Sequence, residues 1–240
     1  MKFENEELRT PRGIVNTFVK LFERSFDKNL ANSIYVSRRQ INSNTIDITQ
    51  TTENEVSKAI QPLKPYMTAG SDSIPSFLVR DCAAILTKPL TIIFNLILKQ
   101  SMFPHAWSES RIVPLYKFGS RNEMINYRPI TLINNFAKIF EIVLHSQMYS
   151  HVTTCLAPQK HGFTKGKSTV TNLILKTQFL AECIDKRSQV DCIYMDFSKT
   201  FDRLNHQLLL TKMDEFGFSA SLILLFKTYL PNRYQYVYHV

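Results

Sequence analysis

The chain has 240 residues, of which 44% are hydrophobic, so it is long enough to bury a core as one or two domains. Its formal net charge of +9 favours a polyanionic partner, either nucleic acid or an acidic surface. The four cysteines lie 73, 28 and 9 residues apart, which fits no zinc site, redox motif or disulfide framework. Because the N-terminus also lacks the apolar core of a signal peptide, an intracellular protein is expected.

The N-terminal part of the chain predicts few regular elements. Within residues 1–50, Phe18, Leu21, Phe22, Ser25 and Phe26 indicate one amphipathic helix, and the rest is expected to be loop. A second helix should begin at a capping box formed by Thr52 and Glu55 and end before Pro65. Residues 69–75 form a turn cluster, and a long helical pattern follows over 77–101, with a break expected at Pro89.

The most apolar run of that pattern, residues 90–98, is far shorter than the roughly 20 residues that cross a bilayer. No membrane partner is therefore expected.

The second half of the chain alternates between extended segments and helices. Extended pieces are predicted at 111–116, 126–132, 190–196 and 233–240, and helices at 135–150, 169–186, 206–216 and 220–230. A basic, glycine-containing loop over 159–169 precedes the second of these helices. Residues 111–200 carry 12 Lys and Arg against 6 Asp and Glu, so most of the excess positive charge lies here.

Residues 190–206 carry the most specific functional pattern, Val-Asp-Cys-Ile-Tyr-Met-Asp-Phe-Ser-Lys-Thr-Phe-Asp-Arg-Leu-Asn-His. An apolar run with the composition of a buried strand delivers Asp196 at its end, where a carboxylate can face a metal or a substrate. Read without its neighbours, Asp196 would more often cap a strand end or turn, and Phe201 would more often be a core residue. The other blocks of the chain decide between these readings.

Six blocks occur in the order found in the reverse transcriptase domain of LINE-type (non-LTR) retrotransposons, and together they carry a resemblance to that family. Besides the aspartate segment, they are Gly70 to Pro75, Phe103 to Trp107, Val113 to Lys117, Asn126 to Leu132 with Lys138 to Glu141, and Gln159 to Thr169. The resemblance implies an α/β (α+β) fold: the fingers and partial palm of a right-hand polymerase, with helices around a small, mainly antiparallel sheet. Residues 1–50 would be an N-terminal extension, 51–188 fingers-like, and 189–240 partial palm.

The resemblance also implies the chemistry of individual residues. Asp196 is expected to be the catalytic carboxylate and, with the backbone carbonyl of Phe197, to hold Mg²⁺ in a two-metal nucleotidyl transfer. Phe201 corresponds to the aromatic residue that excludes a ribose 2′-hydroxyl, and Lys117 and Arg128 are expected to contact the incoming nucleotide. Residues expected to contact the nucleic-acid backbone are Lys160, Lys165, Lys167 and Ser168. Asp202 and His206 are expected to cap or brace the following helix.

The expected partners are therefore an RNA template, an RNA–DNA duplex and deoxynucleoside triphosphates, and the nucleus is a further candidate compartment. The second aspartate motif of the family does not occur within these residues. We therefore expect the 240-residue chain to be inactive by itself, with Mg²⁺ required by the complete enzyme. Two alternatives remain open at this stage: a non-enzymatic nucleic-acid-binding fragment, and a product without function.

Overall fold

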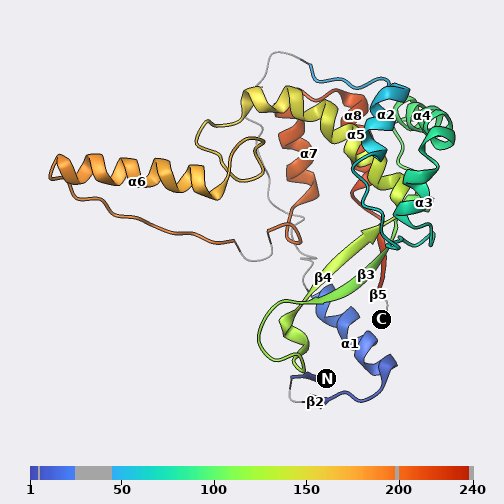
Figure 1. Cartoon of the computed structure of the whole chain (residues 1–240), viewed down its shortest axis with the longest axis horizontal. Coiled ribbons are helices and arrows are strands. Elements are labelled where there is room, and N and C mark those ends of the chain that lie inside the picture. The colour runs from blue at the N-terminus through green and yellow to red at the C-terminus, as the bar shows by residue number, and fades with distance from the viewer. Residues whose placement is uncertain (5, 25–44, 198–199, 238–240) are drawn as a thin grey trace.

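The computed structural model describes residues 1–4, 6–24, 45–197 and 200–237. Ser25 and Phe26 of the expected N-terminal helix lie outside this range. The described chain forms a helical body, a small sheet covered by one helix, and an arm that projects from the body (Figure 1).

The sheet has three strands in the order β4-β3-β5, and it confirms the α/β prediction. Strand β3 (Glu109–Tyr116) pairs antiparallel with β4 (Tyr127–Ile133) and parallel with β5 (Tyr234–Val237). The sheet is therefore mixed. Its parallel pair joins segments about 125 residues apart in the chain, with Glu109 beside Tyr234 and Ile112 beside Val237.

Helix α1 (Pro11–Glu23) lies against this sheet and closes a small second core (Figure 1). Phe18 and Phe22 are buried with Ile112 and Met124, and the ring of Phe18 meets that of Tyr127 edge-on at 5.4 Å. The short strands β1 (Lys2–Phe3) and β2 (Glu6–Glu7) form a ladder next to it. The sequence predicted this helix but not its position against the sheet.

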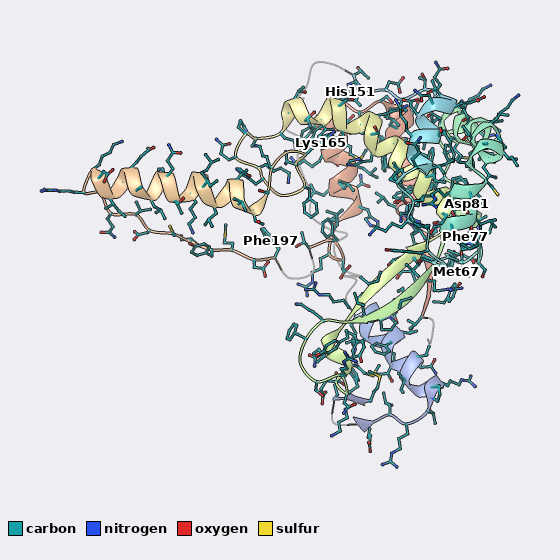
Figure 2. The ribbon with its side chains drawn as sticks, in the orientation of Figure 1. Met67, Phe77, Asp81, His151, Lys165 and Phe197 are labelled. Carbon is teal, nitrogen blue, oxygen red and sulfur yellow. The ribbon has the colours of Figure 1, made fainter. Side chains whose placement is uncertain are left out.

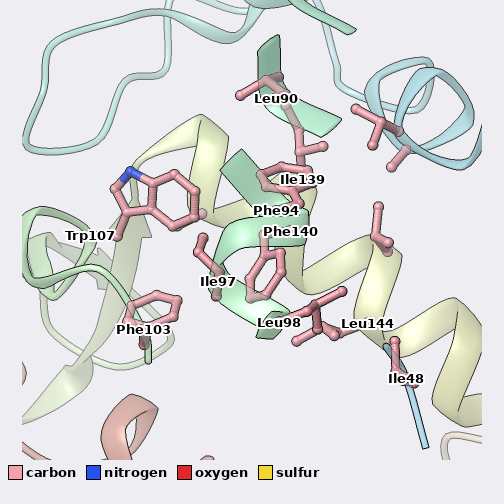
Figure 3. Packing of buried hydrophobic residues seen from close by; sticks show 14 of the residues in the cluster. Ile48, Leu90, Phe94, Ile97, Leu98, Phe103, Trp107, Ile139, Phe140 and Leu144 are labelled. Carbon is pink, nitrogen blue, oxygen red and sulfur yellow. The ribbon is translucent and has the colours of Figure 1, made fainter. Parts of the chain in front are cut away.

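The main core lies between α2 (Glu53–Ile60), α4 (Ala83–Gln100), α5 (Asn135–Val152) and α8 (Ala220–Tyr229). Figure 3 shows Phe94 and Phe140 in contact at its centre, with Phe103 and Trp107 beside them. The predicted capping box begins α2, because Glu55 N–H donates to the Thr52 hydroxyl while Thr52 N–H donates to the Glu55 carboxylate.

The break in the long helical pattern lies at a different residue from the one predicted. A short helix α3 (Ser76–Asp81) ends before Cys82, and α4 continues through Pro89 without interruption. Pro89 lies on the exposed side of α4, where water can replace the backbone hydrogen bond that its missing N–H cannot donate. By length and composition α4 could cross a membrane, yet its inner face is buried in the core.

The arm consists of α6 (Thr169–Asp185) and the chain that returns from it, which run side by side away from the body (Figure 1). The strand predicted at 190–196 is wrong, since residues 189–197 have no regular structure and Ile193, Tyr194 and Met195 are each more than three-quarters exposed. A strand needs a neighbour to satisfy its backbone hydrogen bonds, and the described residues offer this segment none. Helix α7 (His206–Glu215) then leads back into the body.

Candidate functional site

A hollow of about 770 Å³ lies between the tip of the β3–β4 hairpin, helix α1 and the turn that follows Asp196. Four residues predicted from three sequence blocks line it: Lys117, Arg128, Asp196 and Phe201. These residues come from positions up to 84 apart in the chain, so their convergence is a property of the fold. The two cations, the Asp196 carboxylate and the exposed Phe201 ring therefore face one space.

The two cations, Lys117 and Arg128, lie near the tip of the β3–β4 hairpin. Lys117 directly follows β3, and its backbone N–H donates to the carbonyl of Asn126 at 2.9 Å, which closes the hairpin. The Lys117 ammonium lies 4.7 Å from the centre of the exposed Phe118 ring. Arg128 lies in β4 opposite Leu115 and is exposed, and Pro129 follows it in extended backbone, as the sequence predicted.

The turn after Asp196 places the carboxylate and the aromatic ring. Asp196 is exposed at the end of the returning arm, and the carbonyl of Phe197, the second predicted metal ligand, accepts a hydrogen bond from the Thr200 hydroxyl at 3.1 Å. The side chain of Phe201 is 75% exposed, so the core-packing alternative for this residue is wrong in this chain. Figure 2 shows Phe197 at the inner end of the arm's return segment, where the chain approaches the body.

Asn205, rather than Asp202 or His206, caps the helix that follows the aspartate segment. The amide oxygen of Asn205 accepts a 3.0 Å hydrogen bond from Leu208 N–H and caps α7. The prediction that Asp202 or His206 supplies this cap is wrong, because His206 is the first helical residue and Asp202 lines the hollow. Asn205 fits the preference of N-cap positions for a short side-chain acceptor, a signal that the sequence itself carries.

The basic loop predicted to hold a nucleic-acid backbone lies between α5 and α6. The Lys160 ammonium donates to the carbonyl of Gly162 at 2.8 Å, and that of Lys167 donates to the carbonyl of Pro158. Lys165 is exposed, with its backbone N–H donating to the Tyr149 hydroxyl at 2.7 Å (Figure 2). The Ser168 hydroxyl caps α6 by accepting from Thr171 N–H at 3.2 Å, so its first role is structural.

One aromatic contact joins this loop to the hollow. Phe163 has a left-handed backbone (φ +56°) and an 86% exposed side chain, and its ring meets Phe201 edge-on at 5.9 Å. The basic loop therefore touches one residue of the hollow, Phe201, through Phe163. Neither this contact nor the presence of Leu21 and Phe22 in the hollow was predictable from local sequence patterns.

The possible metal ligands in the hollow fit a Mg²⁺ site only in part. A carboxylate and a backbone carbonyl are hard oxygen ligands of the kind that Mg²⁺ prefers. Within the described ranges, however, no group of three or more His, Cys, Asp or Glu side chains could hold a metal ion. Asp196 would thus supply a ligand to a site that the described residues do not complete.

Comparison with known proteins identifies the family. Residues 117–239 match the family described as reverse transcriptase (RNA-dependent DNA polymerase), which is just over half of the chain and begins at Lys117. The chain belongs to the reverse transcriptase family. The matched range contains the whole predicted site, from Lys117 and Arg128 to Asp196 and Phe201.

Relatives of this reverse transcriptase chain are retrotransposon proteins. It is 26% identical over 182 residues to a probable RNA-directed DNA polymerase from transposon BS of Drosophila melanogaster, covering 75% of this chain and 20% of the relative. It is 28% identical over 185 residues to the RNA-directed DNA polymerase from mobile element jockey of Drosophila funebris, covering 76% of this chain and 20% of the relative. A Pol polyprotein from the retrotransposable element R1 of Bradysia coprophila is 27% identical over 165 residues, which are 68% of this chain and 16% of the relative.

The chain therefore spans about a fifth of the length of these relatives. It is a reverse transcriptase domain homologous to the RNA-directed DNA polymerases of non-LTR retrotransposons, which confirms the family predicted from the sequence blocks.

Proposed function

We propose that this chain supplies the nucleotide- and template-holding part of an RNA-directed DNA polymerase. The observation that carries the proposal is the convergence of Lys117, Arg128, Asp196 and Phe201 on one hollow. In this proposal the substrates are deoxynucleoside triphosphates, an RNA template and the growing RNA–DNA duplex.

The two cations would hold the triphosphate. The Arg128 guanidinium can donate two parallel hydrogen bonds to a phosphate, whereas the Lys117 ammonium acts as a point charge. Both side chains are exposed at the hairpin tip, so they can turn toward an anion without leaving a buried partner. Asp196, which lines the same hollow, would supply a carboxylate ligand to a metal ion, and that ion would balance the phosphate charge once the remaining ligands are present.

Phe201 would lie beneath the sugar and exclude a ribose 2′-hydroxyl by its bulk. Its ring is exposed and meets Phe163 edge-on, and because it is not packed in the core it can contact a bound sugar. The basic loop of Lys160, Lys165 and Lys167 would then contact the nucleic-acid backbone next to the nucleotide.

Nucleotide binding to the 240-residue chain tests the first step. A fluorescent deoxynucleoside triphosphate should bind, and Lys117→Ala with Arg128→Ala should weaken binding about tenfold, which equals about 1.4 kcal/mol. Lys186→Ala with Arg187→Ala removes the same charge at the end of α6, outside the hollow, and should leave the Kd unchanged. If both double variants lost the same nucleotide affinity, the loss would come from the lower overall charge of the chain. The hollow would then be rejected as the nucleotide site.

Primer extension tests the catalytic step. Residues 1–240 with poly(A), oligo(dT), Mg²⁺ and labelled nucleotide should give no extension, because the described residues gather too few ligands for a metal. A fusion that adds the segment following the matched region in the jockey polymerase should extend the primer, and Asp196→Ala should abolish this activity. Extension by residues 1–240 alone, or by the Asp196→Ala fusion, would contradict the proposal.

The second candidate function is non-enzymatic nucleic-acid binding. The exposed basic loop favours it, since phosphate contacts there need neither a metal nor the hollow. A chain that binds RNA through the loop, binds no nucleotide and stays inactive in the fusion would have this function instead.

A further inference from the structure

The outward face of α4 is an apolar stripe that the fold leaves uncovered. Ile85, Pro89, Ile92 and Leu96 follow one another at spacings of four, three and four residues, the pattern of a helix that pairs with another helix. Their exposed fractions are substantial: 77% for Ile85, 55% for Ile92 and 49% for Leu96. Ile93, 41% exposed, widens the stripe.

These side chains contribute nothing to the main core. The opposite face of α4 buries Leu90, Phe94, Ile97 and Leu98, and that face alone packs into the main core. Isoleucine is also a weaker helix former than lysine or glutamate, so helix propensity does not account for three isoleucines at solvated positions. A contiguous exposed apolar stripe of this kind is typical of an interaction surface.

The charges beside the stripe indicate the chemistry of its partner. Lys88 and Lys99 are the charged residues of α4, and both are exposed beside the stripe, three turns apart. Between Ala83 and Gln100 the sequence contains no Asp or Glu. A second copy of α4 would therefore bring four lysines and no carboxylate to the seam, and nucleic acid would leave the isoleucines uncovered.

We propose that the outward face of α4 docks an amphipathic helix of a protein partner that has leucine or isoleucine along its seam and glutamate or aspartate beside it. Leucines of the partner would cover Ile85, Ile92 and Leu96, while its carboxylates would meet Lys88 and Lys99. Helix α4 lies on the outer side of the helical body, away from the arm and from the hairpin (Figure 1), and none of its residues lines the hollow, so this docking leaves the hollow open.

Two labelled peptides provide the probe. Both are three-heptad helices with leucine at the a and d positions; one has glutamate at e and g, the other lysine. The glutamate peptide should bind the 240-residue chain at least about tenfold more tightly than the lysine peptide, as measured by fluorescence anisotropy. Lys88→Glu with Lys99→Glu should reverse this order.

Ile92→Ser with Leu96→Ser should weaken binding of the glutamate peptide by about tenfold or more, because the change removes two of the three large aliphatic side chains that the partner would cover. Leu173→Ser with Ile174→Ser is the matched control, since both residues are equally apolar and more than half exposed but lie on α6. That control should leave the Kd unchanged. If the α4 pair lowers the melting temperature, Ile85→Ser with Ile93→Ser tests the same face.

Several results would overturn the proposal. Equal affinity for the two peptides would show apolar adhesion without charge recognition, and equal losses in the α4 and α6 variants would show that no particular face is used. Sedimentation of the chain as a dimer, abolished by Ile92→Ser with Leu96→Ser, would make a second copy the occupant. Co-sedimentation with phosphatidylserine vesicles through these residues, without binding of the glutamate peptide, would make the occupant a lipid surface.

Discussion

The hydroxyl of Tyr229 donates a 2.7 Å hydrogen bond to the carboxylate of Glu141, and this bond joins α8 to α5 at the edge of the main core. The guanidinium of Arg233 lies 4.2 Å from the centre of the Tyr229 ring and pairs with the same carboxylate at 3.8 Å. Arg233 also donates to the carbonyl of Trp107 at 3.4 Å. Because β5 begins at the next residue, Tyr234, this cluster fixes the position at which β5 joins β3.

The cluster should make stability depend on pH. Burial raises the pKa of Glu141, and the Tyr229 hydroxyl and Arg233 oppose this only in part. A carboxyl group with a raised folded-state pKa adds stability that is fully present below its unfolded pKa of about 4.5 and is lost as pH rises through the folded value. Urea unfolding of wild type and Glu141→Gln should therefore show a stability difference, wild type minus variant, that falls as pH rises above 4.5 and then levels off. A difference that rises over this interval would show that Arg233 outweighs burial.

Gly70 is predicted to tolerate no side chain. A Cβ at this position would lie 2.5 Å from both the N and Cα atoms of Asn134 and 2.7 Å from the carbonyl carbon of Ile133, all backbone atoms that cannot turn aside. Gly70→Ala should therefore destabilise the chain by about 1–3 kcal/mol. Gly162→Ala is the control, because nothing lies within 4 Å of its Cβ, and it should stay within about 1 kcal/mol of wild type. Equal melting temperatures for the two variants would contradict the close approach of residue 70 to residue 134.

Local signals predicted most elements but not their pairing. The capping box of Thr52 and Glu55 and the helix end at Gly217, which has φ +87°, follow from side chains and backbone preferences within a few residues. The β3–β5 pair joins residues about 125 apart, and no local pattern reveals such a partner. The strand expected at 190–196 failed for the same reason, since its composition is that of a strand while its backbone has no neighbour among the described residues.

In the candidate site, too, local sequence predicted the residues but not the contacts between distant segments. Its chemistry-bearing residues were found because each lies in a sequence block that resembles the family. The contact between Phe163 and Phe201, and the presence of α1 in the hollow, depend on how distant segments meet. The roles assigned to these residues remain predictions, and two measurements address them.

The basic loop should bind RNA through its phosphates. Lys165→Ala with Lys167→Ala should weaken binding of a labelled, single-stranded RNA. The slope of log K against log salt should become shallower by roughly 0.7 for each phosphate that these lysines neutralise. Lys58→Ala with Lys64→Ala removes the same charge near α2 and should change the slope little. RNA binding that persists at high salt, or that responds equally to both pairs, would show that this loop does not hold the backbone.

Phe201 provides the sharpest test, because its exposure separates two explanations that sequence alone could not. With 75% of its side chain exposed, Phe201→Ala in the 240-residue chain should change the free energy of unfolding by no more than about 0.5 kcal/mol. Phe94→Ala, at a fully buried position, should cost about 3–5 kcal/mol. This contrast is measurable by urea unfolding without any activity assay.

In the jockey fusion, Phe201→Val should then admit ribonucleotides far more readily while deoxynucleotides are still used. The reason is steric, since removal of the ring frees the space that a 2′-hydroxyl needs and breaks no hydrogen bond to the sugar. Single-nucleotide kinetics with matched ribo- and deoxynucleotides give the discrimination ratio as a quotient of kcat/KM values. A stable variant that keeps its preference for deoxynucleotides would remove Phe201 from sugar selection, and its edge-on contact with Phe163 would then serve only to join the basic loop to the hollow.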